Sequence, residues 1–305
     1  MKPTSKYKYL VHSEKDLKWG VVVDTVGHQL IDSNYTSYPL KAGHPSSFYF
    51  DINKGRILKS YQLVYIASGR GKFYGHDKVC HEIGPGNIIL LRPNSWHTYM
   101  PEKDSGWHEY WIGFYGHDID ARIKNNIFGL DCEIFDIGVN MEIVSLFEKA
   151  IEIADKELSA YQQYLAGIAV HLLGFVIYNN SNKRFTEIDT ISQIDMARKI
   201  IREEIYNAIS PAEVAQRVNM SYSWFRKIFR EYTHISPAQY MQQLRLEEAC
   251  NLLANTPMSI KEIAFRLNYG DASYFSNIFH RKLKITPIDY RRKFGSKELL
   301  KETEE

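Results

Sequence analysis

The chain has 305 residues, of which 44% are hydrophobic and 24% are charged, a composition that fits two globular domains and excludes a largely disordered chain. Its formal net charge is only +2, but Met196 to Phe294 hold 16 Lys and Arg against 9 Asp and Glu, so the basic charge is concentrated in the last third. Three widely spaced cysteines, Cys80, Cys132 and Cys250, suit a reducing compartment and exclude a disulfide framework or a paired-cysteine metal site.

The sequence predicts a soluble cytoplasmic protein. Its first residues, MKPTSKYKYL, lack the apolar core of a signal peptide. The most apolar run, from Ile168 to Tyr178, is too short to cross a bilayer and contains His171.

Residues 6–136 predict many short β-strands separated by Gly and Pro. Tyr61 to Tyr74 indicates a strand, a Gly turn and a second strand, and the stretches HEIGPGNIILLRPNSWHTYMP and GWHEYWIGFYG continue the pattern. Strands at this rhythm are typical of a barrel or a sandwich. We therefore expect a β domain over residues 1–139.

Two helices are predicted over residues 140–180, because apolar residues recur there at helical spacing. One apolar stripe must cover the β domain, and a spare one would pair with a second subunit. The stripes are Ile143, Leu146, Phe147, Ala150, Ile153 and Ala154 in the first helix and Leu165, Ile168, Ala169, Leu172, Phe175 and Val176 in the second. Asn179 to Glu187 is polar and predicts a flexible connection, which places a linker at 181–190.

The last hundred residues contain an internal repeat. The stretch from Ala212 to Tyr240 recurs about 50 residues later, with one residue inserted near Gly270. Eleven positions match: Ser210/Ser259, Glu213/Glu262, Ala215/Ala264, Arg217/Arg266, Asn219/Asn268, Phe225/Phe275, Ile228/Ile278, Phe229/Phe279, Ile235/Ile285, Pro237/Pro287 and Tyr240/Tyr290. So many matches in a short window indicate one structural unit used twice.

Each repeat predicts a short capped helix, a turn and a second helix. The sequences SPAE and SIKE are capping boxes, Pro211 suits a first helical position, and Asn219 and Asn268 can take the left-handed conformation that ends a helix. The second helices have buried faces of Phe225, Ile228, Phe229 and Tyr232 in one repeat and Phe275, Ile278, Phe279 and Leu283 in the other.

The outer faces of these second helices are polar. They carry Ser223, Arg226, Lys227 and Arg230 in the first repeat and Ser273, Asn277, His280 and Arg281 in the second. A charged face on a single helix indicates no more than a helix surface exposed to solvent. Its duplication, after a short helix and a tight turn, favours two helix-turn-helix motifs, whose second helices enter the major groove of DNA.

A helix from Ser236 and Pro237 to about Asn255 is predicted to join the two motifs, with Tyr240, Leu244, Ala249, Leu252 and Leu253 inward. A helix of roughly 18 residues is about 27 Å long. Successive major grooves on one face of B-DNA lie about 34 Å apart, so both motifs can reach DNA together once their width is added.

These residues resemble the DNA-binding domain of the AraC/XylS family of bacterial transcription regulators, over about 191–295. The second repeat carries most of that family's signature: Ile263, Ala264, Gly270, Ser273, Tyr274, Phe275, Phe279, Thr286, Pro287 and Tyr290. The resemblance implies base contacts from positions corresponding to Tyr222, Ser223, Arg226 and Lys227 and to Ala272, Ser273 and Asn277. With the outward Arg230, His280 and Arg281, these form the predicted DNA-binding set. Asn277 departs from the basic residue that relatives often carry, and asparagine favours adenine where arginine favours guanine.

In that family the first half of the chain is a cupin-like barrel that binds an effector, and GNIILLRPNSWHTY followed by WHEYWIGFYG resembles its sugar-responsive members. The fold class expected is therefore α+β with two domains. Metal-binding cupins resemble one another in a close pair of histidines, a Glu and a later His; here only His97 matches, while His76, His81 and His108 are scattered. We expect no metal, no other cofactor and no catalytic residue.

Sugars are bound by aromatic rings and a few polar groups. Alternation of side chains puts Glu109 and Trp111 on one strand face and His97 and Tyr99 on another. In sugar-responsive relatives the pocket positions resemble Tyr99, Glu109, Trp111 and Arg56, with Lys54 the rival cation. Glu at position 109 departs from those relatives. The alternative is that Tyr99 and Trp111 are only core aromatics.

The sequence thus predicts a ligand-responsive, DNA-binding transcription regulator that forms a homodimer, with RNA polymerase a further partner if it activates transcription. Two rivals are a cupin-type metalloenzyme fused to a DNA-binding module and a constitutive regulator whose barrel only dimerises.

Overall fold

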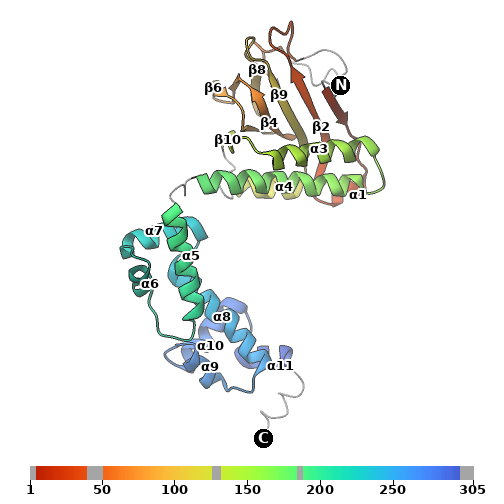
Figure 1. The fold of residues 1–305 in the computed structure, drawn as a ribbon. Helices are drawn as coiled ribbons and strands as arrows, with labels where there is room; N and C mark the ends of the chain where they lie inside the picture. Colours follow the sequence, from red (N-terminus) through yellow and green to blue (C-terminus); the bar gives the residue numbers. More distant parts are fainter. Residues whose placement is uncertain (1–4, 40–50, 126–131, 184–187, 296–305) are drawn as a thin grey trace. The chain divides into compact units, whose positions relative to one another are not determined.

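The computed structural model describes residues 5–39, 51–125, 132–183 and 188–295. The chain divides into two compact units, Met1–Arg184 and Phe185–Glu305. The first contains two antiparallel sheets and four helices, and the second is built from helices (Figure 1). The predicted α+β organisation with two domains is confirmed.

The first unit, called here the β unit, contains one sheet of six strands and one of four. The strands of the larger sheet, in spatial order, are β1 (Ser5–Tyr9), β2 (Val22–Ile31), β9 (Trp107–Tyr115), β4 (Tyr61–Gly69), β7 (Asn87–Leu91) and β10 (Ile134–Asp136). Those of the smaller sheet are β3 (Arg56–Ile57), β8 (Trp96–Pro101), β5 (Gly71–Tyr74) and β6 (Cys80–Ile83). The two strands predicted around the Gly turn are β4 and β5, which belong to different sheets, so the chain changes sheet at that turn.

The larger sheet separates two hydrophobic cores. On β4, Leu63 and Tyr65 belong to one core, while Val64 and Ile66 belong to the other. Successive side chains of a strand point to opposite faces, so a strand covered on both faces is apolar throughout. This explains why the sequence of β4 has no alternation of polar and apolar residues.

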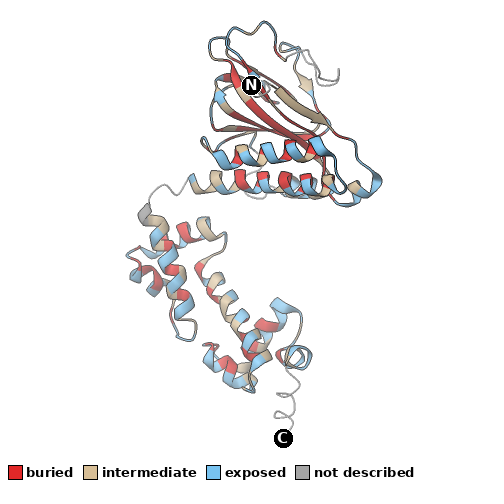
Figure 2. Cartoon of the chain, turned by 45° about the vertical axis from the view of Figure 1, so that its right-hand side comes forward, coloured by how far each residue is buried: buried red, intermediate tan, exposed pale blue. Residues whose placement is uncertain are grey.

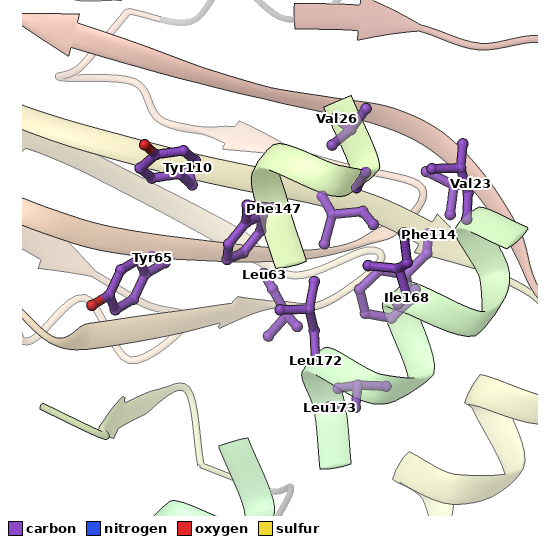
Figure 3. Close-up of a cluster of buried hydrophobic side chains, with 14 of the residues drawn as sticks. Val23, Val26, Leu63, Tyr65, Tyr110, Phe114, Phe147, Ile168, Leu172 and Leu173 are labelled. Atoms are coloured by element: carbon purple, nitrogen blue, oxygen red, sulfur yellow. The ribbon is translucent and has the colours of Figure 1, made fainter. Parts of the chain in front are cut away.

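Four helices accompany the sheets: α1 (Glu14–Lys18), α2 (His117–Lys124), α3 (Met141–Lys156) and α4 (Tyr161–Asn182). Helices α3 and α4 cover one face of the larger sheet (Figure 1). Phe147 of α3 packs between Tyr65 and Tyr110 of the sheet, with ring centroids 6.3 and 5.7 Å away (Figure 3). Every apolar residue predicted for the second helix is buried. In the first helix Leu146 and Ile153 are only partly buried, and Ile151 is buried instead.

The predicted flexible connection over Asn179 to Glu187 begins too early, and the predicted linker 181–190 overlaps a helix at both ends. Helix α4 continues to Asn182, and α5 (Ile188–Glu203) begins inside the predicted linker 181–190. The asparagines remain helical because their side-chain amides bond the carbonyls one turn earlier: Asn179 donates to Phe175 O at 2.9 Å and Asn182 to Tyr178 O at 2.8 Å.

The second unit, called here the helical unit, has two halves with separate hydrophobic cores. Beyond α5 its helices are α6 (Pro211–Arg217), α7 (Tyr222–Thr233), α8 (Pro237–Asn255), α9 (Ile260–Arg266), α10 (Ala272–Leu283) and α11 (Pro287–Phe294). Helix α8 contributes its first half to one core and its second half to the other, as predicted for the joining helix. Figure 2 shows the buried residues as stripes along these helices.

The internal repeat of the sequence is also a repeat in space. Both predicted capping boxes form, at Ser210 with Glu213 and at Ser259 with Glu262. Asn219 and Asn268 have φ of 56° and 59°, which confirms the left-handed exit from each short helix.

The same aromatic triad closes each half. The Phe225 and Phe229 rings lie 5.3 Å apart, and Tyr240 packs on the edge of Phe229 at 5.4 Å. The matching distances in the second half are 5.6 Å between Phe275 and Phe279 and 5.5 Å to Tyr290.

One predicted core residue is wrong: Leu283 is 40% exposed. It is the last residue of α10, and Lys284 then turns the chain into the left-handed conformation. Ile285, beyond this turn, packs against the core in its place. Its counterpart Tyr232, earlier in its helix relative to the turn at His234, is partly buried as predicted.

Candidate functional site

Helix α7 separates its apolar and polar residues by face. Ser221 caps its N-terminus, and Phe225, Ile228 and Phe229 are buried against the preceding helices. The predicted DNA-binding residues all lie on the exposed side: Tyr222, Ser223, Arg226, Lys227 and Arg230.

These exposed side chains line a surface hollow along α7, together with Glu231 and His234. In the described part of the chain, Arg226 and Arg230 form no ion pair, and Lys227 lies 5.6 Å from the ring centroid of Trp224. Exposed cations without an acidic partner are free to bind phosphate or the edge of a base.

Helix α10 repeats the arrangement with less positive charge. Asp271 caps its N-terminus, accepting from the backbone N–H of Tyr274 at 2.7 Å. The predicted residues Ser273, Asn277, His280 and Arg281 are exposed, and Ala272 is half-buried. The exposed faces of α7 and α10 therefore have the same position on their helices but carry different side chains.

In the β unit, three predicted ligand-binding residues meet between the two sheets. The Arg56 guanidinium donates from Nε to His97 Nε2 at 3.1 Å and from Nη2 to the Tyr99 hydroxyl at 2.9 Å. Nη2 also lies 3.4 Å from Gln62 Oε1. The rival cation Lys54 is exposed. Arg56, itself half-buried, thus forms the centre of a polar cluster whose other predicted members, His97 and Tyr99, are buried.

His97 in this cluster is a neutral imidazole. Its burial and the adjacent Arg56 charge lower its pKa to about 3. Because Nε2 accepts from Arg56, Nδ1 carries the proton and donates to Ser95 O at 3.2 Å. The His97 and Tyr99 rings are stacked, with centroids 6.3 Å apart, and burial raises the pKa of Tyr99 to about 12.

Glu109 lies in the same interior but takes its hydrogen bond from Tyr38. The Tyr38 hydroxyl lies 3.2 Å from Oε2 and 3.3 Å from Oε1 of Glu109. Glu109 is 4% exposed, and this burial raises its pKa to about 8 despite the hydrogen bond and the Arg56 charge. A buried carboxyl with so few partners is an acceptor that a ligand hydroxyl can use.

Trp111 shares the interior with Glu109 but contacts other residues. Its indole Nε1 donates to Thr25 Oγ1 at 3.1 Å, and its ring stacks on Tyr7 with centroids 6.1 Å apart. Gly27 allows this approach, since a Cβ there would lie 2.4 Å from Tyr7 Cβ and 2.7 Å from Trp111 Cζ2. Trp111 therefore forms one wall of the interior rather than part of the Arg56 cluster.

Sequence reasoning missed two polar residues of this interior, Tyr38 and Gln62. Gln62 lies within a strand of otherwise apolar residues, and that interruption was a usable signal. Tyr38 lies outside any helix or strand, so no periodicity could place it. Within the described residues no group of three or more His, Cys, Asp and Glu side chains could hold a metal ion, and no helix is long and apolar enough to span a bilayer.

Both units match known families. Residues 214–293 match the helix-turn-helix domain family model, and residues 50–171 match the AraC-like ligand binding domain. The chain belongs to the AraC/XylS family of transcription regulators. It therefore combines a DNA-binding unit with a domain for a small effector.

Relatives of this AraC-family chain are similar over most of its length. It is 23% identical to the raffinose operon transcriptional regulatory protein RafR of Pediococcus pentosaceus, covering 89% of this chain and 98% of that protein. It is 25% identical to the transcriptional activator RhaR of Mannheimia succiniciproducens, covering 77% and 86%. It is 24% identical to the lactose operon transcription activator of Staphylococcus xylosus, covering 88% and 95%.

Proposed function

We propose that this AraC-family regulator binds a neutral saccharide between the two sheets of its β unit and responds by changing how it binds DNA. The observation that carries the proposal is the polar cluster of half-buried Arg56 with buried His97 and Tyr99 on the smaller sheet, and Glu109 and Trp111 on β9 of the larger sheet. Polar groups are rarely buried without a partner or a use, and a few of them among aromatic walls suit the hydroxyls and apolar ring faces of a sugar.

The relatives support the same class of effector. Two of them are named as regulators of a raffinose and a lactose operon, and each is similar across nearly the whole of this chain. Such sugars carry no phosphate or carboxylate, and the described residues of the interior include one cation, Arg56, and one carboxyl, Glu109, rather than a cluster of cations that would bind an anion.

For DNA we propose that α7 and α10 each insert their exposed face into a major groove. The 19-residue helix α8 belongs to both cores, so it connects the two reading helices within one unit. At about 1.5 Å per residue it is about 28 Å long, comparable with the roughly 34 Å between successive grooves. Arg226 and Lys227 are the proposed contacts on α7, and Ser273 and Asn277 those on α10.

We further propose a homodimer in which α4 pairs with its copy. The exposed residues of this helix are Tyr164, Gly167, His171, Gly174 and Tyr178, a stripe spaced by three and four residues. The order Tyr, Gly, His, Gly, Tyr is the same in both directions, so an antiparallel copy related by a two-fold axis near His171 meets matching residues. The glycines permit close approach of the two helices.

Effector binding would act by shifting a population between arrangements of the two units. A sugar can do so only by binding one arrangement more tightly than the other. RNA polymerase is the expected further partner if the change activates transcription.

A thermal-unfolding screen against raffinose, lactose and their component monosaccharides tests the proposal. An effector at 100 times its dissociation constant should add about 2.7 kcal/mol of stability. The Arg56→Gln variant should lose this stabilisation, while Lys54→Gln, which removes a nearby exposed cation, should keep it. A panel without any stabilising sugar would favour a barrel that only dimerises, and a shift that persists in Arg56→Gln would move the site elsewhere.

A further inference from the structure

Tyr38 fills part of the interior of the β unit from a segment without regular structure. Residues 32–39 form no helix or strand, yet the Tyr38 side chain is only 8% exposed. Its ring lies edge-on to Trp107, with centroids 5.8 Å apart, and to Tyr99 at 6.1 Å. Its hydroxyl is the hydrogen-bond donor to Glu109.

This placement reproduces what a sugar ring would need. The side chain of Tyr38 has a six-membered ring that packs against Trp107 and Tyr99, and its hydroxyl donates a hydrogen bond to the buried carboxyl of Glu109. A pyranose has a ring of similar size, C–H edges that pack on aromatic faces, and hydroxyls that donate to carboxyl oxygens. The same neighbours could therefore hold either group, but not both at once.

We propose that Tyr38 occupies the effector's ring subsite, so that a pyranose must displace it to reach Trp107, Tyr99 and Glu109. This inference rests on the proposed saccharide function. It adds where the sugar ring lies, which sugar hydroxyl binds Glu109, and that Tyr38 competes with the sugar for this position.

The segment that carries Tyr38 can leave without breaking a sheet. Two hydrogen bonds hold the residues just before Tyr38: the Tyr35 hydroxyl donates to Pro101 O at 2.8 Å, and Asn34 N donates to Lys103 O at 2.6 Å. Neither belongs to a strand ladder. Because residues 32–39 belong to no strand, the release of Tyr38 leaves the strands of both sheets paired.

Competition at this position also gives selectivity. When Tyr38 leaves, Glu109 loses its donor, and a buried acceptor without a partner is unfavourable. A ligand with a hydroxyl at that point restores the bond, whereas a deoxy analogue does not. Displacement is thus favourable only for a ring that carries the correct hydroxyl.

The first arm of the test uses phenol, which copies the lost side chain. Tyr38→Gly opens a space of tyrosine size, and phenol should raise the unfolding temperature of this variant in a saturable way while leaving the wild-type protein unchanged. A pyranose that binds the variant should compete with phenol, seen as a weaker apparent affinity for phenol when the sugar is present.

The second arm titrates the same pyranoses into Tyr38→Phe, which keeps the ring and removes only its hydrogen bond. The loss of that bond weakens the occupied state, so sugar affinity should rise about 3- to 10-fold. Tyr161→Phe is the matched control, because its hydroxyl donates to the main-chain carbonyl of Val11, away from the cluster and from the segment that carries Tyr38, and its sugar affinity should stay at the wild-type value.

Weaker sugar binding by Tyr38→Phe, or simultaneous binding of phenol and sugar, would overturn the proposal. If no saccharide binds the wild-type protein, the sugar class fails, and phenol alone decides whether Tyr38 occupies a ring site: saturable binding to Tyr38→Gly keeps that role, and its absence removes it. Should Tyr38→Gly not fold, the Tyr38→Phe titration decides by itself.

Discussion

Arg226 and Phe225 are adjacent in the chain, but one side chain is exposed to solvent and the other is buried. Phe225 is fully buried against the short helix before it, whereas the Arg226 side chain is exposed on the outer face of α7. The helical rotation of about 100° per residue produces this separation, and the buried aromatics fix the rotation of the helix about its axis. The direction of the arginine is thus a consequence of core packing.

Arg226→Ala should weaken binding to the specific operator by about 1 to 3 kcal/mol and relax the preference at one base pair. The reason is that arginine recognises guanine through two hydrogen bonds that no other contact replaces. Titration of operator and random duplexes by fluorescence anisotropy measures both effects. Arg70→Ala removes the same charge from the β unit and serves as control. Equal losses on both duplexes would instead assign Arg226 to phosphate.

Glu109 should make the β unit less stable as the pH rises. Its pKa of about 8 lies above the ordinary value of 4.5, so between these values the folded protein holds a proton that the unfolded chain releases, and stability falls with rising pH. His97 has the opposite slope, because its pKa of about 3 lies below 6.5 and stability is lost as the pH falls through that range. The two effects oppose each other between pH 4.5 and 6.5, and only the Glu109 effect continues to pH 8.

We expect the free energy of unfolding to fall by about 2 kcal/mol between pH 6.5 and 8 in the wild-type protein and to stay level in Glu109→Gln. The amide keeps an acceptor for Tyr38 and cannot titrate. Urea unfolding followed by tryptophan fluorescence at each pH gives the difference between the two proteins, in which other titrating groups cancel. Parallel declines in both would show that Glu109 is ionised in the folded state.

The two helices proposed to read DNA, α7 and α10, are equivalent as structures and unequal as electrostatic surfaces. Repeated capping boxes, left-handed asparagines and aromatic triads give α7 and α10 the same packing. Helix α7, however, has three exposed cations, one exposed carboxylate at Glu231 and a neutral serine cap, whereas α10 has two exposed cations, Arg281 and Lys282, and begins with the carboxylate of Asp271. Since DNA is a polyanion, α7 should contribute more of the salt-dependent affinity than α10.

Asp271→Ser, which copies the cap of α7, should strengthen DNA binding about twofold at low salt. Serine keeps the capping bond to the backbone and removes a negative charge from the end of the helix that we propose to face DNA. The gain should disappear near 1 M salt, where the Debye length is about 3 Å. Ser221→Asp is the reciprocal variant and should weaken binding. Unchanged affinity in both would place the two caps away from the phosphates.

At the scale of the whole molecule, the exposed stripe of α4 has a composition that no contact among the described residues of one protomer explains. Exposed glycines at 167 and 174 weaken a helix by about 1 kcal/mol each relative to alanine, and a Cβ at either would meet no atom within 4 Å. An isolated protomer gains nothing from them, whereas a second α4 packed closely on this stripe needs them.

Gly174→Glu should therefore leave the folded protomer as stable as before, or more stable, and convert the dimer to monomer. Sedimentation velocity measures the assembly, and circular dichroism verifies that the helix persists. Lys149→Glu, an exposed substitution on α3, controls for the added negative charge and should leave the dimer intact. A Gly174→Glu protein that remains dimeric would exclude α4 as the interface.

The sequence by itself determined the helical unit almost completely. Capping residues, a 3.6-residue apolar period and a duplicated motif act over a few residues, so Ser210, Asn219 and Phe225 could be placed without long-range contacts. Two predictions from local sequence were wrong. The polar residues Asn179 to Asn182 remained helical, with side-chain hydrogen bonds to the preceding turn. Leu283 was exposed rather than buried because the chain turned at Lys284.

The interior of the β unit was decided by tertiary structure. Strand alternation put His97 with Tyr99 and Glu109 with Trp111, but it could not tell that Arg56 bridges the first pair or that Trp111 turns to Thr25. It had no means of placing Tyr38, because that residue reaches Glu109, 71 positions away, from a segment without periodicity. Contacts between residues so distant in sequence depend on how two sheets face each other, and no local pattern encodes that.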